Sequence, residues 1–129
     1  MAGNSKNAIM KSVLNASATS LAASFSSTPF DIRTLDNIAV QLNATTSNAV
    51  GTFSVQGSLD YNPGGSTSPS GPVAGNWIAI TLPAIPTLAS VDAQFLLDLN
   101  QLSFPWLRIA YTRTSGTGTV DIYVSGKAV

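Results

Sequence analysis

The stretch GTFSVQGSLD, residues 51–60, alternates apolar and polar side chains with a period of two. In an extended chain Phe53, Val55 and Leu59 point to one side, and the polar residues between them point to the other. Gly57 falls on the apolar side, where it leaves space for a large neighbour or marks a bulge. The pattern predicts a β-strand with one face in a core and the other in water.

Four further segments, residues 36–43, 94–100, 106–113 and 120–124, show the same alternation. Their apolar positions, expected to face inward, are Ile38, Val40, Leu42, Phe95, Leu97, Leu99, Leu107, Ile109, Tyr111, Val120, Ile122 and Val124. No stretch of a dozen residues has helical spacing, so the period of two decides the fold class. The chain is predicted to be all-β: an antiparallel β-sandwich, jelly-roll-like, of about six to eight short strands.

Connections and weaker strands complete this prediction. Polar residues 43–48 and glycine-containing residues 114–118 predict two β-hairpins, the second joining the last two strands. Weak alternation in residues 16–25 predicts an early strand, and residues 77–82 predict another that ends at the prolines that follow. Residues 61–75 contain three prolines and four glycines, which predicts a long exposed loop and a candidate contact surface.

The length of 129 residues indicates one domain. Residues 1–15 carry no strand pattern, so they are predicted to form a flexible N-terminal arm, with residues 16–129 as a single β-sandwich domain. The N-terminus lacks the apolar run of a signal peptide, and no apolar stretch approaches the length of a membrane span. A soluble protein made in the cytoplasm, with no membrane partner, is expected.

Charged side chains are scarce, at 9% of the residues where about 25% is typical. Six basic residues balance six acidic ones, which leaves no basic field for phosphate and predicts no nucleic-acid partner. Cysteine and histidine are absent, so the sequence offers no thiolate nucleophile, no Cys or His metal ligand and no imidazole to activate a serine. No aspartate pair or Gly-x-Ser-x-Gly motif is recognisable, so no catalytic residue, cofactor or metal site is predicted.

Four aromatic residues, Tyr61, Trp77, Trp106 and Tyr123, are the candidate ligand or contact residues. An exposed row of planar rings stacks on sugars, whereas Trp77 at the start of a strand and Trp106 after a proline are also typical of rings that seal a core. Rings that seal the end of a core are the favoured interpretation, and a row of rings that binds sugar stays open. Arg108 and Asp121, on the polar faces of the last two strands, are expected to form a cross-strand ion pair.

Five blocks of sequence carry a resemblance to a known group of proteins: GTFSVQGS (51–58), WIAITL (77–82), FLLDLNQ (95–101), FPWLRIAYTRTSGTG (104–118) and IYVSGK (122–127). In this order, from about residue 28 to the end, they resemble small β-sandwich structural proteins of tailed bacteriophages. The resemblance implies a virion component, such as a capsid decoration, neck, tail or fibre protein. It implies no catalysis, and it brings no catalytic residues to transfer.

The composition fits the same expectation independently. A surface with few charges and no net charge favours association. We therefore expect a symmetric homo-oligomer located in the virion, with other copies of itself and other virion proteins as partners. The alternative is a carbohydrate-binding β-sandwich module that uses the exposed aromatics on a glycan, and a simple extracellular-type module also stays open.

Overall fold

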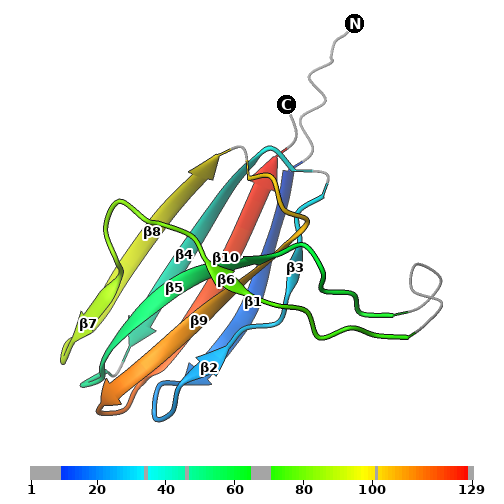
Figure 1. The fold of residues 1–129 in the computed structure, drawn as a ribbon. Helices are drawn as coiled ribbons and strands as arrows, with labels where there is room; N and C mark the ends of the chain where they lie inside the picture. Colours follow the sequence, from blue (N-terminus) through cyan, green and yellow to red (C-terminus); the bar gives the residue numbers. More distant parts are fainter. Residues whose placement is uncertain (1–9, 34, 46, 65–70, 101, 128–129) are drawn as a thin grey trace, which may run out of the picture.

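The computed structural model describes residues 10–33, 35–45, 47–64, 71–100 and 102–127. Within them the chain forms ten β-strands and no helix. The strands are β1 (Met10–Ser20), β2 (Phe25–Ser26), β3 (Phe30–Asp31), β4 (Asn37–Thr45), β5 (Val50–Ser58), β6 (Ile78–Ala79), β7 (Thr87–Ala89), β8 (Ala93–Asn100), β9 (Trp106–Ser115) and β10 (Thr119–Lys127). They pack as two antiparallel sheets, which confirms the predicted all-β sandwich (Figure 1).

The strand order is that of a jelly roll. Sheet A has the order β1-β10-β4-β8, and sheet B has the order β2-β9-β5-β6, with β3 also on β9 and β7 also on β5. The short pairs β2/β3 and β6/β7 each act as one interrupted edge strand, so the two sheets hold eight strand positions. Consecutive strands lie in different sheets except at β5 and β6/β7, which are neighbours in sheet B, and this is the connectivity of the double Greek key of a jelly roll.

Both hairpin predictions are wrong. β4 lies in sheet A and β5 in sheet B, and β9 and β10 are likewise in different sheets. The segments 43–48 and 114–118 therefore cross from one sheet to the other. The physical reason is that each of these strands has an apolar face, and two such faces bury more surface when they oppose each other across the core than when they lie side by side.

The expected ion pair between Arg108 and Asp121 is absent because β9 and β10 lie in different sheets. Nε of Arg108 donates instead to Oε1 of Gln56 on the neighbouring β5, at 2.7 Å. Oδ1 of Asp121 accepts the backbone N–H of Ala18 at 2.6 Å. Gln56 and Arg108 are directly paired across β5 and β9, so the arginine contacts its true neighbour strand.

The core lies between the sheets, and most of the predicted inward faces are confirmed. Phe53, Val55 and Ile109 are at most 1% exposed. Gly57 also faces inward, as predicted, and the Phe104 ring fills the space that its missing side chain leaves. Leu59 is a correction: its side chain is 76% exposed, because β5 ends at Ser58 and the alternation ends with it.

The first strand begins earlier than predicted. β1 starts at Met10 and pairs with β10 along its length, so the boundary predicted at residue 15 falls inside a strand of sheet A. Residues 1–9 of the predicted arm lie outside the described residues. In the strand predicted at residues 77–82, only Ile78–Ala79 is a β-strand, and the backbone N–H of Ile80 still donates to the carbonyl of Val55 at 2.9 Å before Pro83 and Pro86 end the pairing.

Candidate functional site

The chain between β5 and β6 projects away from the sandwich (Figure 1). We call its described parts, residues 59–64 and 71–77, the neck. Asn62 and Val73 bridge the two halves of the neck through two backbone hydrogen bonds, of 2.9 and 2.8 Å. The long loop predicted at 61–75 is therefore paired at its base, and its residues 65–70 lie outside the described residues.

Three of the four candidate aromatic residues meet where the neck joins sheet B. The ring centroids of Tyr61 and Trp77 are 5.4 Å apart, and those of Tyr61 and Trp106 are 4.9 Å apart with the rings edge to face. Trp106 belongs to β9 and pairs with Ser58, the last residue of β5. The two neck residues thus fold back onto the outward face of sheet B. Tyr123 stands apart from them, on β10 of sheet A, and is 37% exposed.

Two arginines extend this aromatic group. The guanidinium carbon of Arg108 lies 4.5 Å from the centroid of the Trp77 ring, and that of Arg33 lies 5.4 Å from the centroid of Trp106. Such cation–π contacts are worth about 0.5–1 kcal/mol at exposed sites. Arg33 also forms an ion pair of 2.6 Å with Asp31, whose hydrogen bond raises the pKa of the arginine. We call Arg33, Tyr61, Trp77, Trp106 and Arg108 the aromatic–arginine cluster.

The three rings of the cluster are half-buried and contact one another or an arginine. Tyr61 contacts both tryptophans, and each tryptophan has an arginine against it. The indole N–H of Trp77 is also used, since it donates to the carbonyl of Ala74 at 3.1 Å. Tyr61, Trp77 and Trp106 thus hold the neck against sheet B, and Tyr123 takes no part in these contacts.

Asp60 fixes the other side of the neck. Its Oδ1 accepts the backbone N–H of Asn76 at 2.7 Å and the hydroxyl of Ser58 at 2.9 Å, and its Oδ2 accepts the Asn76 side-chain amide at 2.8 Å. These bonds, led by the one from the Asn76 backbone, hold the pKa of the Asp60 carboxyl below its ordinary value of 3.8. The carboxylate is ionised at neutral pH, and it joins the two halves of the neck.

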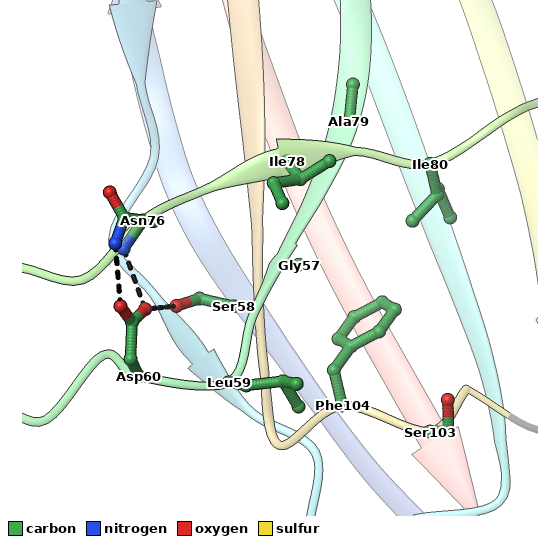
Figure 2. Close-up of a pocket in the computed structure, with 10 residues that line it drawn as sticks. All are labelled: Gly57, Ser58, Leu59, Asp60, Asn76, Ile78, Ala79, Ile80, Ser103 and Phe104. Carbon is green, nitrogen blue, oxygen red and sulfur yellow. Dashed lines mark hydrogen bonds between the residues drawn. The ribbon is translucent and has the colours of Figure 1, made fainter.

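Beside Asp60 and its hydrogen-bond partners lies an open groove with a volume of about 510 Å³. Figure 2 shows Asp60, Asn76 and Ser58 bonded together at one end, and the apolar side chains of Ile80 and Phe104 toward the other. The groove is lined by Gly57, Ser58, Leu59, Asp60, Asn76, Ile78, Ala79, Ile80, Ser103 and Phe104. Leu59 and Ile78 are 76% and 71% exposed, so the groove presents apolar surface to solvent.

The lining of the groove is mostly apolar. Asp60 is the one ionisable side chain of the groove, and three donors already occupy its oxygens. Across the described part of the chain, no three His, Cys, Asp or Glu side chains gather where they could hold a metal ion. No helix long and apolar enough to span a membrane occurs in the same residues.

Sequence reasoning found the aromatic residues but missed the groove and Arg33. A groove arises from the meeting of β5, β6 and the segment before β9, which no local pattern reveals. The one available signal was Gly57, whose inward position predicted a large neighbour, here Phe104.

No family model matches the sequence, and no curated protein matches it. Among solved structures, the chain is similar to a chain in the structure of infectious bursal disease virus, Gx strain, with a TM-score of 0.47 and 7% sequence identity. The similarity covers 95% of this chain and 32% of that chain. The present chain therefore spans about a third of the length of its structural neighbour.

Proposed function

We propose that this chain is a non-enzymatic structural protein of a bacteriophage virion, acting as a capsid decoration, neck, tail or fibre component. It assembles as a symmetric homo-oligomer and contacts other virion proteins. The observation that carries the proposal is a jelly-roll sandwich that leaves apolar side chains uncovered. Jelly rolls recur in viral capsid and lectin domains, so the fold raises this function by analogy, and the uncovered surface is the physical argument.

Several large apolar side chains of the sandwich and its loops are exposed to solvent. Large hydrophobic side chains exposed by more than half are Leu59, Ile78, Ile85, Val91 and Leu96. Apolar side chains left in water in this number favour contact with another protein, since covering them removes apolar area from solvent. With twelve charged residues in the chain, ion pairs contribute little to such contacts.

The proposed contact elements are the part of the predicted N-terminal arm that precedes β1, residues 1–9, and the loop at 61–75. The loop at 61–75 is supported as a contact element by its neck, residues 59–64 and 71–77, because Asp60 and the aromatic–arginine cluster hold the neck on sheet B. The proposed location is the virion, after synthesis in the host cytoplasm.

Light scattering after size exclusion tests the assembly. The full chain at tens of micromolar is expected to be oligomeric, with the same mass at low and high salt. A monomer would contradict the homo-oligomer, and dissociation by salt would contradict an interface poor in charge. Mass spectrometry of particles from the virus whose genome encodes the chain tests the location, and absence from purified particles would refute the virion role.

A carbohydrate-binding module is the second candidate, since Tyr61, Trp77 and Trp106 do meet at the surface. Arg33 and Arg108 each lie against one tryptophan ring, so a sugar would have to stack on ring surface that they leave free or displace them. Glycan-array binding that is lost in Trp77→Ala and kept in Tyr123→Ala would favour this candidate.

A further inference from the structure

The four sheet edges of the sandwich differ in how far they are protected against pairing. In sheet B the edges are β2/β3 and β6/β7, each only two or three residues long and each interrupted. In sheet A, β1 is irregular, with two register shifts against β10 and a positive φ of 46° at Ala18. Short strands and bulges are the devices by which proteins stop edge-to-edge association.

β8 has neither device. Its eight residues, Ala93–Asn100, pair with β4 in one unbroken register and include no proline. In the described part of the chain, no backbone hydrogen bond joins the other edge of β8 to any segment. β8 is thus the one long and regular edge among the described strands.

The side chains of β8 also lack a neighbour. Leu96, in the middle of the outward row, is 73% exposed. In the inward row, Phe95 and Leu97 pack against the core but stay partly exposed. This is the burial expected of a strand that has lost the neighbour on one side.

We propose that β8 pairs antiparallel with β8 of a second copy, about a two-fold axis, and joins the two four-stranded sheets into one sheet of eight strands. This inference rests on the proposed homo-oligomer and specifies its interface. An isologous contact needs a surface that is complementary to itself, and β8 meets that condition.

The strand sequence disfavours the axis at Phe95, and the proposal places the axis at Leu96, where the most exposed apolar side chain of β8 meets its own copy. In the joined sheet, each outward side chain must lie opposite an outward side chain of the second copy. The two-fold axis must therefore lie between one residue and the same residue of the second copy. With the axis at Leu96, that side chain meets Leu96 of the second copy, and Asp98 lies opposite Gln94. With the axis at Phe95, Asp98 would lie opposite Asp92, and like charges directly opposed are unfavourable.

The absence of cysteine from the sequence makes the test simple, because Leu96→Cys introduces a single thiol. Directly opposite Cα atoms of antiparallel strands are about 4.5–5.5 Å apart, within the range that a disulfide spans. The full chain carrying Leu96→Cys should form a disulfide-linked dimer under mild oxidation. Tyr123→Cys, exposed on the same outward face but two strands from the β8 edge, is the matched control and should stay unlinked.

A charge placed at the same position gives an independent measurement. Leu96→Lys opposes two ammonium groups at the axis and should weaken the dimer by about tenfold or more. Thr52→Lys, exposed in sheet B, is the control and should leave the dissociation constant unchanged.

The outcomes separate this inference from the proposed function. Cross-linking at residue 96 together with dissociation by Leu96→Lys supports the β8 interface. An oligomer that persists in Leu96→Lys and does not cross-link in Leu96→Cys overturns the β8 interface and leaves the homo-oligomer standing. A wild-type chain that stays monomeric contradicts both.

Discussion

Replacement of Gly57 by alanine tests the packing of the groove floor directly. A Cβ atom at this position would lie 2.6 Å from Cδ2 and Cε2 of Phe104 and 2.8 Å from its Cγ. Ordinary carbon contacts are about 3.5–4.0 Å, so the ring would have to move by about 1 Å. Gly57 is not among the glycines with positive φ, so the backbone accepts alanine and the clash is the only penalty.

The expected loss of stability follows from two opposing effects. Overpacking of this kind costs about 1–3 kcal/mol. Replacing a strand glycine returns about 0.5–1 kcal/mol through the lower entropy of the unfolded chain. The net free energy of unfolding should therefore fall by about 1–2 kcal/mol, which for a domain of this size lowers Tm by about 4–8 °C.

Urea unfolding followed by tryptophan fluorescence and by circular dichroism measures this change as a lower midpoint at unchanged slope. Ser54→Ala, on the outward face of the same strand, is the control for a general effect of alanine in β5. The deciding experiment is a double-mutant cycle with Phe104→Ala, which removes every ring atom that the new Cβ would meet. In that background Gly57→Ala should cost almost nothing, and an equal cost in both backgrounds would refute the assigned contact.

Three further predictions concern the core and the neck. Ile109→Asp, at a site that is 0% exposed, should unfold the chain, because an unpaired buried charge costs several kcal/mol of a total of about 5–15; a normal β-type circular dichroism spectrum would contradict the assigned face. Tyr111→Phe should raise the urea midpoint, because the Tyr111 hydroxyl is buried with no hydrogen-bond partner among the described residues and such a group costs about 1–3 kcal/mol; a lower midpoint would show that the hydroxyl is satisfied in solution. The Asp60 carboxylate has a lowered pKa in the fold, so its contribution is present above the ordinary value of 3.8 and is lost as the pH falls through the folded value; the fluorescence of Trp77 should change in that acid range, and Asp60→Asn should remove the change.

The inward faces of the strands could be predicted from the sequence because a period of two is a local property. Val55 and Ile109 are assigned correctly by their immediate neighbours, and the two residues prove to be directly paired. The partner of a strand is not a local property. Alternation determines which face of a strand is buried but not which strand lies beside it. The sequence pattern therefore predicts a hairpin of β9 and β10, although the two strands lie in opposite sheets.

The candidate site shows the same limit. Trp106 was identified as an aromatic candidate, but its contact with Tyr61 depends on how the neck folds back over sheet B. Arg33 lies in an irregular segment with no pattern, so no signal in the sequence placed it against that ring. Gly57 is the exception, because a glycine on the apolar face of a strand leaves space that a large neighbouring side chain fills, here Phe104.

The position of β10 determines when the fold is complete during synthesis. β10 lies between β1 and β4 in sheet A, yet it follows every other described strand in the chain. Until it leaves the ribosome, β1 has no neighbour in its sheet, and one edge of β4 is unpaired along its length. Until β10 has emerged, the nascent chain therefore exposes strand edges that invite association with other nascent chains, so protection of these edges by a chaperone would favour productive folding.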